Sequence, residues 1–207
     1  FEKDEFVSMG SCVGGRFYVN RLAVDCDLLV TEGFIEPHFF AGFSGGRKSI
    51  LPGICSAETV NENHSYKAIA AFAAAGVLEG NPIHEDMICA ARRVNVQFIL
   101  NVALNARKEI IAAFAGDVEA AHLELPDIRS VSEEPAVTGD IVVTSNGGYP
   151  LDQNLYQSPK AVATRGLRRG GRGDHHGLRV PGSIGGSHFE ELIMDGIRRR
   201  SNRKLSA

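Results

Sequence analysis

Short apolar runs alternate with segments of helical spacing along most of the chain, and this alternation is the feature that most constrains the fold. The apolar runs have the length and β-branched content of buried strands, and they occupy residues 27–31, 96–102, 109–114 and 140–144. Helical spacing occupies residues 63–75, 81–93 and 117–125. Strands that alternate with helices predict an α/β protein with mainly parallel sheets.

Capping signals place the ends of these helices. Asn81 followed by Pro82 predicts a helix start, and Gly76 predicts the end of the helix before it. Asp117 is a suitable cap for the third helix. Ser187 with Glu190 forms a capping box, which predicts a last helix running to about residue 199.

Residues 125–138 contain two prolines and mixed charges with little apolar periodicity, so they are the best candidate for a linker. The chain is therefore expected to form two α/β lobes, residues 1–135 and residues 136–207, with the active site in the cleft between them. Ligands of open α/β sheets bind beyond the carboxyl ends of the strands, which favours such a cleft.

Composition limits the class of protein. The 207 residues are 43% hydrophobic and 23% charged, which excludes a disordered chain, a collagen-like repeat and a small disulfide scaffold. No run approaches the 18 or so apolar residues of a membrane span, and no signal peptide is visible at the start. We expect a cytoplasmic protein with no membrane partner.

The four cysteines lie far apart, and no Cys-x-x-Cys pair indicates a zinc or redox motif: Cys12, Cys26, Cys55 and Cys89. An even count also allows two disulfides. In a cytoplasmic protein we expect reduced, mostly buried thiols.

The net charge of −3 is unevenly distributed, with +7 over residues 160–207 and −10 over residues 1–159. Residues 165–182 hold five Arg and six Gly, a composition also found in disordered RNA-binding segments. That tract contains no aromatic residue to stack on bases, so we expect no nucleic-acid partner.

Residues 36–53 (EPHFFAGFSGGRKSILPG) are the densest candidate site. His38 follows the strand predicted at residues 27–31, where ligands of α/β sheets bind. Gly45 and Gly46 allow close backbone approach, while Arg47 and Lys48 supply charge that can pair with an anion. The segment lacks the full phosphate-loop spacing, so a structural turn and a phosphate site remain open alternatives.

Three other histidines carry less information. His64 lies at the predicted helix start, where a histidine is more often a cap or surface residue than a ligand. His84 and His122 occur in charged helical surroundings and are interpreted as ordinary helix residues.

A second polar cluster follows the strand at residues 140–144. Residues 145–160 (SNGGYPLDQNLYQSPK) begin with a glycine pair and end with Gln157 and Lys160, which are three residues apart and share one face of a helix. A solvated helix start and a grip on a small anion are both consistent with this pattern.

The two motifs, together with NENHS at residues 61–65, resemble in sequence and order those of the nickel-dependent lactate racemase family. The resemblance covers about residues 8–160 and 185–196. It implies a racemase or epimerase that acts on a small 2-hydroxy acid, lactate in the first instance. It also implies nickel and a nickel-pincer nucleotide of the pyridinium-3,5-bisthiocarboxylic acid mononucleotide type. Proteins that synthesise this cofactor are the expected cellular partners.

The resemblance carries roles for five residues. His38 matches a catalytic acid/base, and His64 matches the nickel ligand that joins the sulfur, carbon and sulfur donors of the pincer. Lys48 matches the lysine that holds the cofactor through a thioamide. Gln157 and Lys160 match substrate-binding residues. Imidazole suits Ni(II), for which tetragonal geometry is normal, and a histidine can exchange protons near neutral pH.

The family pattern also includes a second catalytic histidine and cofactor contacts that precede the first residue of this chain. On this basis residues 1–135 match the end of a catalytic and cofactor-binding lobe, and residues 136–207 the start of a C-terminal lobe. The chain alone is expected to lack full activity. A nucleotide-binding module without catalysis is the alternative function, and RNA binding through the Arg/Gly tract is a weaker one.

Residues 165–182 interrupt the pattern expected of the second lobe, so they are interpreted as a frameshifted segment. Shifted by one base, with suitable codons, residues 167–180 can encode a helix end, a Gly-Gly turn and an apolar strand. His175 and His176 would then be artefacts. The alternative is a lineage-specific loop insertion, and resequencing of codons 165–182 distinguishes the two.

Overall fold

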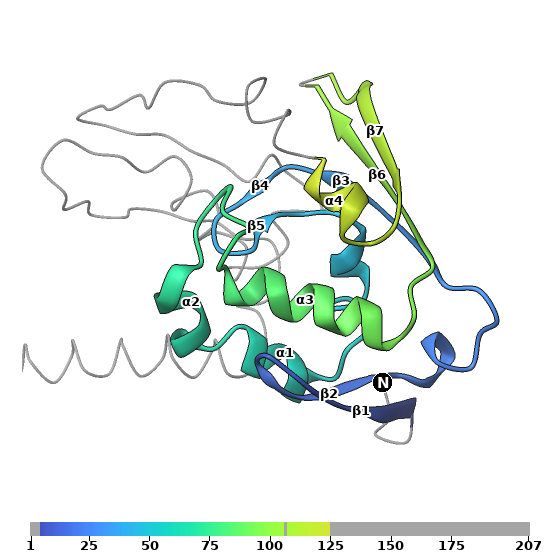
Figure 1. The fold of residues 1–207 in the computed structure, drawn as a ribbon, viewed down its shortest axis with the longest axis vertical. Coiled ribbons are helices and arrows are strands. Elements are labelled where there is room, and N and C mark those ends of the chain that lie inside the picture. The colour runs from blue at the N-terminus through green and yellow to red at the C-terminus, as the bar shows by residue number, and fades with distance from the viewer. Residues whose placement is uncertain (1–4, 106, 125–207) are drawn as a thin grey trace, which may run out of the picture. The chain divides into compact units, whose positions relative to one another are not determined.

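The computed structural model describes residues 5–105 and 107–124 (Figure 1). The chain divides into two units, Phe1–Glu133 and Glu134–Ala207, and every described residue belongs to the first. Several predicted features lie outside the described residues: the linker, the strand at 140–144, Gln157, Lys160, the tract at 165–182 and the last helix.

A three-stranded sheet forms the centre of the first unit, in the order β3 (Val30–Ile35), β6 (Phe98–Leu104) and β7 (Ile110–Gly116). Strands β3 and β6 are parallel, and α3 (Pro82–Arg93) lies in the connection between them (Figure 1). The α/β class is therefore confirmed.

The sheets of the described part are mixed in direction, which corrects the expectation of mainly parallel sheets for this part of the chain. Strand β7 runs antiparallel to β6, because only residues 105–109 connect the two strands and a parallel crossover needs a dozen or more residues. Two further pairs are antiparallel: β1 (Phe6–Cys12) with β2 (Gly15–Asn20), and β4 (Pro37–His38) with β5 (Gly42–Phe43).

The two faces of the central sheet differ in exposure. Thr31, Ile35, Ile99, Asn101 and Ala103 are buried on one face. Helix α3 packs its apolar side into the same core cluster as Ile99. The opposite face leaves partly exposed large apolar side chains, namely Val30, Phe34, Phe98 and Leu100.

Three predicted elements agree closely with the structure. The side-chain oxygen of Asn81 accepts from the backbone N–H of Ile83 at 3.0 Å and caps α3, with Pro82 in its first turn. Strands β6 and β7 begin within two residues of their predicted starts. Their periodicity and caps were sufficient to predict them.

The strand predicted at residues 27–31 begins three residues later than expected. The side chain of Gln97 accepts from the N–H of Leu29 and donates to the carbonyl of Asp27. These side-chain hydrogen bonds replace the strand ladder, which starts where Val30 faces Phe98.

The helix predicted at residues 63–75 is the shorter α2 (Tyr66–Phe72), and α1 (Ala57–Asn63), which the sequence did not predict, precedes it. The Ser65 hydroxyl accepts from the N–H of Ala68 and starts the second helix, so His64 lies between the two helices. The third predicted helix is only the short α4 (Ala120–Leu123), although Asp117 does accept from the N–H groups at its start. None of the described helices is long and apolar enough to cross a membrane.

The expectation of reduced thiols is wrong for two cysteines. Cys12 on β1 and Cys89 on α3 form a disulfide, with Cα atoms 5.9 Å apart. Sequence spacing could not reveal this pair, because 77 residues separate the two and only the fold brings them together. Cys26 is an exposed thiol and Cys55 a half-buried one.

Candidate functional site

The segment from His38 to Lys48 leaves the carboxyl end of β3 and forms a compact turn. His38 ends β4, and residues 39–41 lead into β5. Gly45 then precedes a single-turn helix, η3 (Gly46–Ser49), which holds Lys48 and contacts β3, β6 and α3. His38 and Lys48, both half-buried, are thus the two ends of one short loop.

The glycine pair in this loop lets it lie directly against the sheet. A Cβ atom on Gly33 of β3 would lie 2.9 Å from backbone atoms of Gly45 and Gly46, so the two backbones are in close contact. Gly45 has φ of 120°, which favours glycine. The N–H of Gly46 donates to the side-chain oxygen of Asn101 at 2.7 Å. This N–H is bound within the protein, which favours a structural turn over a phosphate cradle.

Arg47 does not present its charge to an anion, which corrects the role expected for it. Its side chain is fully buried. The guanidinium donates to the backbone carbonyls of Ala41, Phe43 and Ser44. Burial lowers its pKa to about 9, so the group remains mostly protonated at neutral pH.

His38 is oriented by the backbone that follows it. Its Nδ1 accepts from the N–H of Ala41 at 3.3 Å and, more weakly, from that of Phe40 at 3.5 Å. An accepting Nδ1 leaves the proton of the neutral ring on Nε2. In this arrangement the ring is a proton donor at Nε2, and it becomes a base at Nε2 only when the two long contacts to Nδ1 give way.

A shared aromatic ring brings His64 near His38. The Phe40 ring meets the ring of His38 edge-on at 4.6 Å between centroids and that of His64 edge-on at 5.0 Å. The two imidazoles are therefore separated by no more than the sum of these distances. Phe39 stacks on His38 at 4.8 Å and also meets the Phe40 ring edge-on at 4.6 Å. His38 and His64 thus lie near one another, whereas Lys48 is related to them through the chain, at the other end of the loop that begins at His38.

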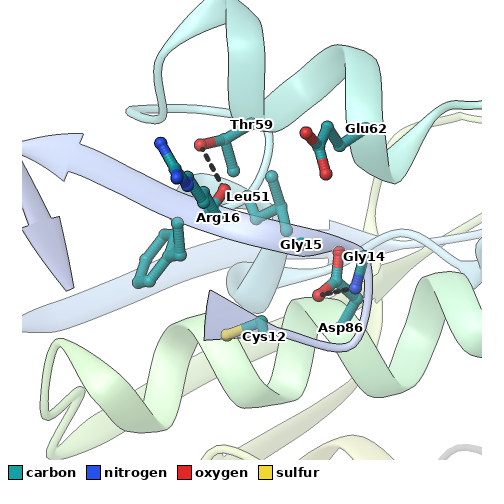
Figure 2. Close-up of a pocket in the computed structure, with 9 residues that line it drawn as sticks. Cys12, Gly14, Gly15, Arg16, Leu51, Thr59, Glu62 and Asp86 are labelled. Carbon is teal, nitrogen blue, oxygen red and sulfur yellow. Dashed lines mark hydrogen bonds between the residues drawn. The ribbon is translucent and has the colours of Figure 1, made fainter. Parts of the chain in front are cut away.

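The end of α1 that carries His64 is anchored by a buried carboxylate, shown in Figure 2. Asp86 of α3 accepts from the Asn63 side chain at 2.7 Å. It also accepts from the N–H of Gly14 at 2.9 Å, the bond drawn in Figure 2. The turn after β1, the end of α1 and the middle of α3 meet there. The surrounding pocket is tight, because a Cβ on Gly14 would lie 2.7 Å from the Asp86 carboxylate. Asp86 is thus a structural anchor beside His64.

His84 and His122 are buried, although the sequence indicated ordinary, charged helix surroundings for both. His84 accepts from the Arg47 Nε at 3.1 Å through its Nδ1, and its ring stacks on that of His122 at 5.4 Å. Burial and the nearby Arg47 charge lower the pKa of His84 to about 3 and that of His122 to about 2. The position of His84 three and four residues before the apolar Met87 and Ile88 could have indicated its burial.

The described residues offer a metal few protein ligands. No three His, Cys, Asp or Glu side chains among them gather in a way that could hold a metal ion. His64 is the ligand candidate that lies near both His38 and the loop ending at Lys48. Gln157 and Lys160 fall outside the described residues, so the structure does not place them.

Comparisons with known proteins match both parts of the chain. A family model described as "Lactate racemase N-terminal domain" matches residues 1–76, and one described as "Lactate racemase C-terminal domain" matches residues 134–171. The chain is 57% identical over 154 residues to a lactate racemase of Thermoanaerobacterium thermosaccharolyticum and 52% identical over 151 residues to one of Lactiplantibacillus plantarum. Each alignment covers 72% of this chain and 35% or 36% of the relative.

Solved structures agree with these matches. The lactate racemase apoprotein of T. thermosaccharolyticum superposes with a TM-score of 0.64 at 53% identity, over 75% of this chain and 38% of that one. A Thermotoga maritima protein superposes with a TM-score of 0.50 at 22% identity, over 68% and 39% of the two chains, and shows the fold alone. The chain spans about a third of the length of the curated relatives that it matches.

Proposed function

Because this chain belongs to the lactate racemase family, we propose that it carries catalytic and cofactor-binding residues of a racemase or epimerase for a small 2-hydroxy acid, with lactate the first substrate to test. One observation above all supports the proposal. His38 and Lys48 end one short loop, and His64 packs against the same Phe40 ring as His38.

The residues present fit a nickel-pincer nucleotide. The nickel of such a nucleotide would need a ligand from the protein, and an imidazole suits Ni(II). His64 is a half-buried imidazole whose helix end is anchored through Asn63 and Asp86. When bound, the nucleotide would supply an acceptor for the hydride of the substrate and would return it to either face.

Lys48 is proposed as the covalent tether of this cofactor. Its backbone N–H donates to the carbonyl of Gly45, and its own carbonyl accepts from the N–H of Gly53, so the backbone that carries the amine is held on both sides. A tether on such a backbone fixes the cofactor with little loss of freedom on binding.

His38 is proposed to move the hydroxyl proton. The two long contacts to Nδ1 first give way, so that the ring carries its proton on Nδ1 and Nε2 is a base. As the C–H bond of the 2-hydroxy acid breaks and its hydride leaves, the O–H proton passes to Nε2, and a 2-oxo acid results. Return of the proton to oxygen and of the hydride to the opposite face of carbon restores the acid with inverted configuration. A positioned histidine contributes about 10²–10⁴-fold to such a proton transfer.

Gln157 and Lys160 are proposed to hold the substrate carboxylate. An ammonium group pairs with a carboxylate, and an amide adds a hydrogen bond that fixes its orientation. Alanine at Lys160 should therefore raise KM for the 2-hydroxy acid while the covalent cofactor remains at Lys48.

The test uses the complete product of the gene, produced together with proteins that synthesise the cofactor. Chiral chromatography should show D-lactate forming from L-lactate, and intact mass should show an adduct that Lys48→Ala abolishes. His64→Ala should lose stoichiometric nickel. Adduct without turnover would favour a cofactor-binding module, whereas wild-type protein with neither adduct nor turnover would refute the proposal.

A further inference from the structure

Every backbone carbonyl from residue 40 to residue 44 is bound to a donor from another part of the loop or of the fold. Asn81 donates to the carbonyl of Phe40 at 2.9 Å, and the N–H of Gly76 donates to that of Gly42 at 2.9 Å. The three remaining carbonyls all accept from Arg47, at 2.9 to 3.1 Å. The stretch between His38 and Lys48 is therefore fixed, and one side chain makes most of the bonds.

Arg47 makes these bonds at an unusual cost. A guanidinium without water around it is unfavourable unless its N–H groups are all but completely bound. Arg47 is fully buried, and no carboxylate of the described residues lies within ion-pair distance. Four of the five guanidinium N–H groups go instead to three carbonyls and to His84. The side chain therefore satisfies three loop carbonyls at once and imposes a defined geometry on them.

His84 sets the orientation of that guanidinium. Its Nδ1 accepts from the Arg47 Nε–H, and its ring is held by stacking on His122. Since both histidines are buried and their pKa values are lowered, His84 remains a neutral acceptor at neutral pH. The guanidinium plane is thus held from α3 on one edge while its other edge binds the loop.

We propose that Arg47 is a positioning residue, which, oriented by His84, fixes the separation between the His38 imidazole and the Lys48 amine. The proposal rests on the proposed function for the roles of those two groups. The hydrogen bonds of the buried Arg47 guanidinium to the loop carbonyls keep His38 and Lys48 at a constant separation. A displacement of about 1 Å between reacting groups can lower a rate about 10²-fold, so such a fork has a large effect on the reaction.

The variants separate geometry from charge. Arg47→Lys keeps the positive charge but cannot reproduce a planar fork to three carbonyls. His84→Gln keeps an acceptor for the Arg47 Nε–H, whereas His84→Ala removes it. Arg93→Met is the matched control, because Arg93 also donates to a backbone carbonyl, that of Met9, but on β1 and away from the loop.

Two measurements on the complete gene product test the proposal. Without cofactor, the labelling rate of Lys48 by an amine-reactive reagent should rise about tenfold in Arg47→Lys and His84→Ala relative to that of Lys108, because a loosened loop opens more often. With cofactor, kcat should fall about 10²-fold in Arg47→Lys while KM changes little, as expected when only reacting geometry is lost. His84→Gln should keep the Lys48 labelling rate and kcat close to those of the wild type, and Arg93→Met should match the wild type in both.

Wild-type labelling of Lys48 and wild-type kcat in a folded Arg47→Lys protein would overturn the proposal. If Arg47→Lys fails to fold, the contrast between His84→Ala and His84→Gln decides, since equal labelling rates in these two variants would refute positioning through His84. The labelling arm needs no racemase activity. An inactive wild type would therefore refute the proposed function while the role of Arg47 in holding the loop is still measured.

Discussion

Two pairs of histidines lie close to the same loop, and the contrast between them shows how burial determines chemistry. His38 and His64 are half-buried and share contacts with the Phe40 ring. His84 and His122 are buried, stack on one another, and lie beneath the loop with Arg47. The first pair is proposed to exchange protons or bind a metal, whereas desolvation keeps the second pair neutral.

The half-buried histidines are therefore the ones proposed for chemistry, whereas the buried ones have a structural role. The side chain that joins the two sets is the loop arginine, because it meets His84 on one edge and binds carbonyls between His38 and Lys48 on the other. Substitutions in the first pair should therefore affect turnover, and changes to the second pair should affect folding and, through Arg47, geometry.

The largest effect is expected from the first pair. His38→Gln should lower the rate of lactate racemisation by about 10²–10⁴-fold, because it removes a proton carrier. Nickel content and the Lys48 adduct should remain at wild-type levels, and the thermal midpoint should change little. Turnover at more than a tenth of the wild-type rate would remove His38 from the mechanism and weaken the contrast.

Acid should destabilise the protein through the second pair. In the unfolded chain both imidazoles have pKa values near 6.5, and in the folded chain these fall to about 3 for His84 and about 2 for His122. Between these values the unfolded chain binds more protons, so the stability is fully present above about pH 6.5 and is lost as the pH falls. Each histidine contributes a slope of up to about 1.4 kcal/mol per pH unit.

Urea denaturation between about pH 7 and pH 5 measures that slope. His122→Leu should flatten it, while His38→Gln, which leaves the buried pair intact, should keep it. Equal slopes in His122→Leu and the wild type would show that His122 is not held neutral in the folded protein.

A smaller effect is expected where the first pair is anchored. Asp86→Asn places an amide against the donors of Gly14 and Asn63, and it should lower the free energy of unfolding by about 1–3 kcal/mol. Glu62→Gln is the control, since Glu62 lines the same pocket but is exposed (Figure 2). Chemical denaturation compares the two, and equal stabilities would remove Asp86 as the anchor of the His64 end.

The smallest effect concerns the ring that the first pair shares. Phe40→Leu removes aromatic edge contacts worth about 0.5–1.5 kcal/mol beyond burial. It should reduce nickel occupancy as well as turnover, because Phe40 touches both His64 and His38. Phe39→Leu should affect turnover alone, since Phe39 stacks on His38. Metal analysis compares the two variants, and equal nickel occupancy in both would show that Phe40 does not support His64.

The sequence could predict those features that depend on local patterns. Asn81-Pro82 capped α3 as expected, and the apolar runs of β6 and β7 were sufficient for those strands. The motif from His38 to Lys48 was also found, because its chemistry is concentrated in one short segment.

Long-range relations escaped prediction. The pairing of Cys12 with Cys89 and the stacking of His84 on His122 each join residues that only the fold brings together. An anion-pairing role for Arg47 stayed open beside a structural turn, because its charge is visible in the sequence while its three carbonyl partners are not. Local hydrogen bonds also outweighed periodicity, as Ser65 shows by starting a second helix.

The partly exposed face of the central sheet, within the part of the chain that the structure describes, has a practical consequence for work with this chain. Val30, Phe34, Phe98 and Leu100 present apolar side chains to solvent on neighbouring strands, with exposed fractions of 38–52%. Contiguous apolar surface of this kind favours self-association and dye binding. Preparations should therefore be compared at the same protein concentration. A sample that contains detergent is needed as a reference before light scattering or dye fluorescence is attributed to unfolding.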